Sequence, residues 1–166
     1  ITAVNELRWI ADHGIENKWP HNAVHERWHG TIKSVCRACM LQSGLPYKSW
    51  DFCLGYASVA LAISQLAPIM PWDKEAAGNI LPAAKEKAKL TCWEAHHNGD
   101  TFSGPRQPFG KLCYYKNKDA HPVTGNTSPG LFLGWRLDNG LRYRDVLLIY
   151  DYDSALKYGF FWRSVK

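Results

Sequence analysis

The stretch from Phe52 to Met70 carries no charged side chain over nineteen consecutive residues, and it constrains the possible folds more than any other feature. An apolar run of this length either crosses a membrane or forms a helix packed inside a protein core. Small, polar and helix-breaking residues interrupt the run at Gly55, Ser58, Ser64, Gln65 and Pro68. Because such residues are costly in lipid or end a helix, we expect a buried core helix and no membrane partner.

The composition fits a folded protein with an anionic partner. Of the 166 residues, 46% are hydrophobic and 21% are charged, and the formal net charge is +5. These proportions allow one sizeable core or two small ones, and the excess of cations favours nucleic acid as a partner. The five cysteines are odd in number and irregularly spaced, and no signal peptide is evident, so we expect reduced thiols in a nuclear or cytoplasmic protein. The start at Ile1 leads us to expect a piece of a longer protein.

One amphipathic helix is predicted over residues 22–42, with Asn22 as its N-cap and a Ser-Gly-Leu-Pro breaker after it. At about 100° per residue, one side collects Val24, Trp28, Ile32, Val35 and Cys39. The opposite side collects Glu26, Gly30, Lys33 and Arg37. We therefore expect the helix to bury the first side and to expose the second side to solvent. The plainest interpretation of Glu26 and Lys33 is that they are ordinary surface charges.

The pattern changes from helical to extended near residue 90. Helices are also expected over residues 3–13, from about Tyr47 onward and, as helix or linker, over residues 71–90. Short apolar segments predict strands at 109–115, 130–136, 143–150 and 159–162, with loops at 98–108 and 117–129. We therefore predict an α+β protein with a helical domain over residues 1–90 and a small antiparallel β-barrel over residues 91–166.

Two metal-binding interpretations involve the helix that carries Glu26. His25, Glu26 and His29 match the zinc hydrolase pattern, in which two His one turn apart hold the metal and the Glu acts as general base. No third ligand follows in a recognisable motif, so the zinc hydrolase is kept as an alternative. A structural zinc site would draw on His21, His25, His29, Cys36 and Cys39. Against both stands the commoner role of such residues, which is packing or capping.

Aromatic residues and cations are interleaved in the second half of the chain. The aromatic residues are Tyr114, Tyr115, Trp135 and Tyr143, and the cations are Lys111, Lys116, Lys118, Arg136, Arg142 and Arg144. This composition is typical of a nucleic-acid-binding face. Aromatic residues equally fill the interior of a small barrel, and alternation alone does not say which side of the strands they occupy.

Several motifs, taken together and in order, resemble the copia-type retrotransposon integrase. The first motifs are NAVHER at residues 22–27, GTI at 30–32 and LQSGLP at 41–46 with Trp50. Later motifs are TCWE at 91–94, FGKLCY at 109–114 and GLFLGW at 130–135, and the segment before all of them ends in HGI at 13–15. Each motif is modest alone, but their collinearity over most of the chain is hard to obtain by chance. In this family an Asn-Gly-Val-Ala-Glu-Arg run carries the last acid of a catalytic Asp-Asp-Glu set.

The resemblance implies both a fold and a chemistry. The implied fold is the helical C-terminal part of a ribonuclease-H-like integrase core followed by a small β-barrel. Glu26 is implied as the third of three carboxylates that hold two Mg²⁺ ions, which activate water or a DNA 3′-hydroxyl for attack on phosphate. Both Asp ligands would precede Ile1, so this polypeptide alone is expected to be catalytically inactive.

The resemblance also implies DNA as the partner. Lys33 and Arg37 suit contacts with DNA phosphates, which supply affinity rather than sequence specificity. The residues expected to bind nucleic acid are Arg27, Lys33, Arg37, Lys111, Lys116, Arg142 and Arg144. Self-association into a multimer is a further expectation. The alternative from another functional class is a non-catalytic nucleic-acid-binding or interaction module.

Overall fold

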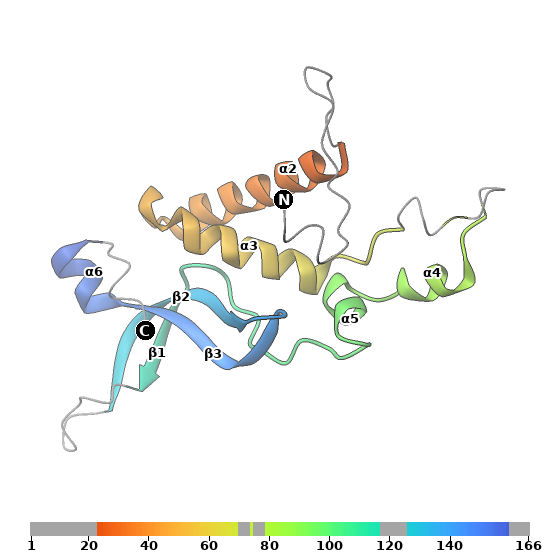
Figure 1. The fold of residues 1–166 in the computed structure, drawn as a ribbon. Coiled ribbons are helices and arrows are strands. Elements are labelled where there is room, and N and C mark those ends of the chain that lie inside the picture. Colours follow the sequence, from red (N-terminus) through yellow and green to blue (C-terminus); the bar gives the residue numbers. More distant parts are fainter. Residues whose placement is uncertain (1–22, 70–73, 75–78, 117–125, 160–166) are drawn as a thin grey trace, which may run out of the picture. The chain divides into compact units, whose positions relative to one another are not determined.

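A computed structural model describes residues 23–69, 74, 79–116 and 126–159 (Figure 1). The chain divides after Thr31 into two units, residues 1–31 and residues 32–166. The helix expected over residues 3–13 and the N-cap expected at Asn22 lie outside the described residues. The elements below belong to the second unit, except for the start of helix α2.

Helix α2, Ala23–Ser43, confirms the helix predicted over residues 22–42. It ends where the sequence places its breaker, because Gly44 adopts a φ of +64° and donates its N–H to the carbonyl oxygen of Met40 at 3.2 Å. The Ser43 hydroxyl oxygen accepts a hydrogen bond from the N–H of Leu45 at 3.3 Å. A 3-10 helix, η1 (Tyr47–Ser49), follows Pro46 and leads into the next helix.

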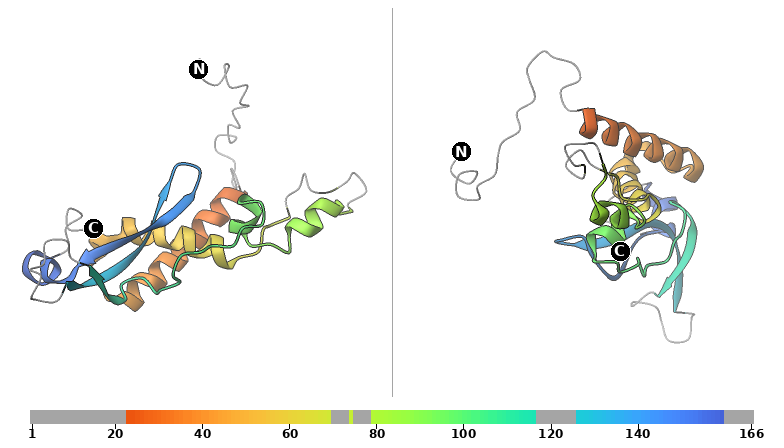
Figure 2. Two further views of the ribbon diagram at one scale, coloured as in Figure 1. Left: turned by 90° about the horizontal axis from the view of Figure 1, so that it is seen from below. Right: turned by 90° about the vertical axis from the view of Figure 1, so that its right-hand side faces the viewer.

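Helix α3, Trp50–Ser64, is the buried helix expected from the uncharged stretch. Its buried side chains are Cys53, Ala57, Val59, Leu61 and Ile63. Within the described part of the chain, no helix has the length and apolarity needed to cross a membrane. The helix packs against strand β2 and helix α5, and Figures 1 and 2 show it between residues 32–43 of α2 and the sheet.

Two short helices connect α3 to the sheet: α4, Pro82–Lys87, and α5, Cys92–His96. A capping box starts α5, since the Thr91 side chain accepts from the Glu94 N–H and the Glu94 carboxylate accepts from the Thr91 N–H. The TCWE motif is therefore a helix start. This helix runs through His96, and His97 follows it as the C-cap.

Three strands form an antiparallel sheet in the order β1-β2-β3. They are β1 (Leu112–Lys116), β2 (Thr127–Asp138) and β3 (Arg142–Asp151), which confirm the first three predicted strands. The barrel is a correction: among the described residues the sheet is open, with β1 and β3 at its edges. The physical reason is that Asp151 caps helix α6, Tyr152–Tyr158, so the chain leaves the sheet after β3. Most of the fourth predicted strand, residues 160–162, lies outside the described residues.

Two clusters of buried residues fill the space between the helices and the sheet. The first joins α2, α3 and the sheet through Cys36, Cys53, Ala57, Phe109, Leu133 and Tyr150. The second is mainly aromatic and contains Val59, Ile63, Trp93, Phe102, Phe132 and Trp135. Each cluster includes residues from both sides of residue 90. The division into domains 1–90 and 91–166 stays a prediction.

Candidate nucleic-acid interface

The second half of α2 presents a basic side opposite its packed side. Ile32, Val35 and Cys36 face the first core cluster, whereas Lys33 and Arg37 are exposed. This is the division that the helical periodicity predicted. In the described part of the chain the ion pairs are Lys89–Glu86 and Arg144–Asp138. Lys33 and Arg37 belong to neither pair, so both cations are available to an anionic partner.

Glu26 and Arg27 lie in the first turns of α2, within the unit formed by residues 1–31. The Glu26 side chain is half-buried and Arg27 is exposed. The Arg27 carbonyl oxygen accepts a hydrogen bond from the Thr31 hydroxyl at 3.0 Å, which is local to the helix. Glu26 and Lys33 belong to different units of the chain. That they share one face of the helix therefore stays a prediction.

A Mg²⁺ site requires several oxygen ligands, so the surroundings of Glu26 can be tested for fit. Over the described ranges, no group of three or more His, Cys, Asp or Glu side chains could hold a metal ion. Glu26 alone supplies one carboxylate. The described residues therefore do not fit a bound Mg²⁺ ion by themselves.

The four predicted sheet cations, Lys111, Lys116, Arg142 and Arg144, are all exposed but do not form one patch. Lys116 pairs with Thr127 at one end of β2, and Arg142 pairs with Asp138 at the other end. These two positions on β2 are separated by about 35 Å in an extended strand. Lys111 donates to the Gln107 side-chain oxygen at 2.8 Å, and Arg144 pairs with Asp138 at 3.0 Å.

The cysteines of α2 and α3 are packed in the core. The Cys53 thiol donates to the Cys36 carbonyl oxygen at 3.4 Å, and the Cys36 thiol donates to the Trp50 carbonyl oxygen at 3.8 Å. Burial raises the pKa of the Cys39 and Cys53 thiols, so both stay protonated, whereas zinc is bound by thiolate. All five cysteines are free thiols, as expected. This arrangement favours packing over the structural zinc site.

The zinc hydrolase alternative depends on His25, Glu26 and His29. His29 is exposed on α2, and the side chain of His25 lies outside the described residues, as does His21. Around His29, as around Glu26, the described part of the chain holds no group of side chains that could bind a metal ion. The geometry therefore adds nothing in favour of this alternative.

The interleaved aromatic residues mostly serve the interior. Trp135 is 6% exposed, and its ring stacks on that of Tyr56 at 5.2 Å between centroids. Tyr143 packs against Phe102 at 5.0 Å, while the Tyr115 hydroxyl donates to Asp151 at 2.6 Å. Tyr114 differs, because it is 72% exposed. The interpretation that these rings fill the core holds for Trp135 and Tyr143, and Tyr114 remains available on the surface.

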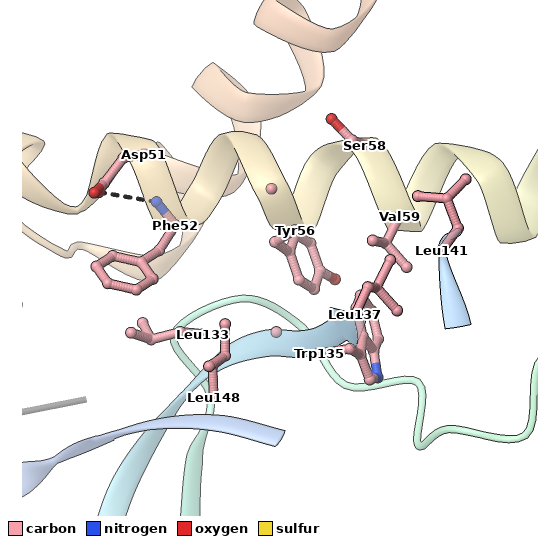
Figure 3. A pocket seen from close by; sticks show the side chains of 12 residues that line it. Asp51, Phe52, Tyr56, Ser58, Val59, Leu133, Trp135, Leu137, Leu141 and Leu148 are labelled. Carbon is pink, nitrogen blue, oxygen red and sulfur yellow. Dashed lines mark hydrogen bonds between the residues drawn. The ribbon is translucent and has the colours of Figure 1, made fainter. Parts of the chain in front are cut away.

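An apolar groove of about 460 Å³ lies between α3 and the β2–β3 hairpin (Figure 3). Its lining residues are Asp51, Phe52, Gly55, Tyr56, Ser58, Val59, Leu133, Gly134, Trp135, Leu137, Leu141 and Leu148. Sequence reasoning missed this groove. The sequence signal for it was the pair of small residues Gly55 and Ser58 on an otherwise apolar helix. In the structure, a Cβ atom added at Gly55 would meet open space.

The described fold thus defines a mixed α+β class in which helices cover an open antiparallel sheet, with a basic side on α2. No family model, no curated protein and no solved structure matches this chain.

Proposed function

We propose that this chain is part of a copia-type retrotransposon integrase and that it binds duplex DNA through the basic side of α2. The observation that carries the proposal is the pair of exposed cations Lys33 and Arg37, which take part in no ion pair of the described chain. They are one turn apart on a helix whose other side is held in the core. Such cations neutralise phosphates without reading the base sequence.

The positions of the motif residues support the integrase part of the proposal. Gly44 of the LQSGLP motif ends α2, and Gly110 of the FGKLCY motif lies directly against Ser43 at the same helix end. A Cβ atom built at Gly110 would fall 2.5 Å from the Ser43 Cβ atom. Motifs that are far apart in sequence therefore meet in space. This is expected if one ancestral fold required all of them.

Glu26 takes the role of the last acid in this proposal. In the integrase family, three carboxylates hold two Mg²⁺ ions at which the phosphate chemistry occurs. Because Glu26 supplies one of the three, the described residues fit DNA binding but not strand transfer. We therefore propose an inactive polypeptide that retains the DNA-binding side of its helix.

The test is a duplex-binding titration of the whole chain against a variant with Lys33→Glu and Arg37→Glu. The variant should bind at least about tenfold more weakly to duplexes of unrelated sequence, because it replaces two phosphate contacts by repulsion. The matched control is Lys85→Glu with Lys87→Glu on α4, which changes the net charge equally at exposed lysines. Equal losses in both variants would show a general charge effect and would contradict a site on α2.

Metal analysis of the purified chain separates the zinc hydrolase from this proposal. We expect no stoichiometric zinc and no change on His29→Ala. Zinc that is bound by the wild-type chain and lost in His29→Ala would favour the hydrolase instead.

A further inference from the structure

Strand β1 forms one edge of the described sheet, and its pairing with β2 shows which of its backbone groups face outward. The Phe132 N–H donates to the Lys111 carbonyl oxygen at 2.9 Å, so position 111 is hydrogen-bonded to β2. In an antiparallel pair the bonded positions recur at every second residue. The N–H and C=O groups of Leu112, Tyr114 and Lys116 therefore point away from β2, toward the open edge.

Two large apolar side chains are exposed along this edge. Leu112 is 50% exposed and Tyr114 is 72% exposed. Both lie on the same side of the strand, because alternate residues of a strand share a side. A row of outward backbone groups beside exposed apolar side chains is a template on which another strand can pair.

A cavity of about 310 Å³ lies beside β1 on the other side of the sheet. Cys113 pairs with Gly130, two residues before Phe132, so Cys113, Phe132 and its partner Ile149 share this side. Besides residues 111–114, the cavity is lined by Pro105, Gln107, Phe132, Leu147 and Ile149. A strand added to β1 would direct the side chain opposite Cys113 into the cavity. Main-chain bonds to a sheet edge, with a pocket for alternate side chains, are how proteins bind peptides by strand addition.

The opposite edge of the sheet, β3, is less suited to strand addition. Asp145 of β3 has a φ of +56°, and the register between β2 and β3 shifts between Trp135 and Leu137. Such an irregularity interrupts the row of outward backbone groups. The register between β1 and β2 is regular from Leu112 to Lys116.

The charges at the β1 edge favour an acidic partner. Lys116 ends the strand, Lys111 precedes it and lines the cavity, and both are exposed. Neither lysine belongs to an ion pair of the described chain, although Lys111 donates to the side-chain oxygen of Gln107. The Asp151 carboxylate, which meets β1 at Tyr115, already accepts a hydrogen bond from that hydroxyl. A second copy of this chain would bring the same two cations to the edge, whereas a peptide with acidic ends would neutralise them.

We propose that the outer edge of β1 and the adjoining cavity bind an extended acidic peptide of another protein, which adds to the sheet antiparallel to β1. The peptide residue opposite Cys113 is apolar and enters the cavity. The residues opposite Leu112 and Tyr114 are apolar and pack on these side chains, and acidic residues stand opposite Lys111 and Lys116. This surface and its partner differ from the helix side and the DNA of the proposed function, so either proposal can fail without the other.

The probe is the acetylated and amidated peptide Glu-Thr-Val-Leu-Val-Glu, which places these side chains in antiparallel register with residues 116 to 111. Its binding to the whole chain is measured by calorimetric titration. A peptide with Ala in place of Leu should bind at least about tenfold more weakly, because the cavity stays empty. A peptide with Lys in place of both Glu residues should lose at least about as much, because like charges meet. Absence of binding at about 1 mM probe, or equal binding of the three peptides, would overturn the proposal.

A pair of variants at Tyr114 tests whether the peptide bonds to the edge. Tyr114→Pro removes an outward N–H group and blocks the approach of a strand, at a position where an edge strand tolerates proline. The matched control is Tyr114→Ala, which loses the same side chain but keeps the N–H group. Tyr114→Pro should bind the probe at least about tenfold more weakly than Tyr114→Ala. Equal affinities of the two variants would overturn strand addition at this edge.

Hydrogen exchange of the wild-type chain gives a second readout that does not require a variant to fold. The amides of Leu112, Tyr114 and Lys116 should exchange at least about tenfold more slowly when the probe is bound. The amides of Cys113 and Tyr115 should change little, because they already face β2. Protection that does not alternate along the strand, or no protection, would overturn the proposal.

Sedimentation of the chain without the probe tests the second copy as the occupant of the edge. We expect the same mass for the wild type and for Tyr114→Pro. A dimer that Tyr114→Pro dissociates would assign the edge to self-association and would overturn the peptide proposal.

Discussion

At the scale of single residues, two glycines of the integrase-like motifs have the same kind of backbone but different surroundings. Gly44 and Gly110 have φ values of +64° and +76°, which favour glycine. A Cβ atom at Gly44 would have nothing within 4 Å, whereas one at Gly110 would fall 2.5 Å from the Ser43 Cβ atom. Gly44 thus needs glycine for its backbone conformation alone. Gly110 also needs it because α2 ends against it.

This difference predicts unequal effects of alanine at the two glycines. Gly44→Ala should lower the free energy of unfolding by about 1 kcal/mol, the cost of a left-handed residue. Gly110→Ala should lower it by about 3 kcal/mol, since the end of α2 must also move. Urea unfolding of both variants measures the two losses. Similar losses would show that the contact between Gly110 and Ser43 has no energetic weight.

At the scale of elements, the side chain of Asp151 joins β1 to α6. One carboxylate oxygen accepts from the Tyr115 hydroxyl at 2.6 Å, and the other accepts from the Ser154 N–H at 2.9 Å. Burial, together with the hydrogen bond to Asp151, raises the pKa of Tyr115 to about 12. The tyrosine must keep its proton to donate to Asp151. The junction is therefore sensitive to alkaline pH.

The raised pKa of Tyr115 determines how stability should depend on pH. Below pH 10, the ordinary pKa of tyrosine, both the folded and the unfolded chain keep the phenol proton, so the contribution of Tyr115 to stability is complete. Above pH 10 the unfolded chain loses the proton first, and stability should decline up to about pH 12. Tyr115→Phe should be less stable by about 1 kcal/mol at neutral pH and should decline less steeply. Denaturant titrations at several alkaline pH values test this, and parallel profiles would contradict it.

The same junction explains why the sequence predicted the strands but not the way in which the sheet ends. Short apolar segments bounded by turn residues specify strands such as 143–150 locally. Whether the sheet closes depends on the path of the chain after β3, and there the Asp151 cap turns the chain into α6. The capping box at Thr91 and Glu94 was likewise present in the sequence, but apolar periodicity gives no signal over a five-residue helix.

The candidate site shows the same contrast between local and long-range information. The basic side of α2 could be predicted because helical geometry alone decides which residues oppose Ile32 and Val35. The sheet cations could not be placed, since the distance between Lys116 and Arg142 depends on the strand register. The contact between the His97 ring and the Leu141 carbonyl oxygen spans more than forty residues of sequence, so no local pattern predicts it.

At the scale of the whole molecule, the unit of residues 32–166 holds one helix side that is both basic and free of ion pairs in the described chain. The cations of the sheet are dispersed between its two ends. We therefore expect the electrostatic part of DNA binding to depend mainly on α2. Because phosphate contacts release counterions, the number of such contacts can be read from the salt dependence of binding.

The measurement that tests the central claim most directly is the salt dependence of duplex-DNA binding by the whole chain. The logarithm of the association constant should fall linearly with the logarithm of the salt concentration. The slope should become shallower by about 2 when Lys33→Gln and Arg37→Gln remove two phosphate contacts. Failure of the wild-type chain to bind duplex DNA at low salt, or a slope that the two substitutions leave unchanged, would contradict the account.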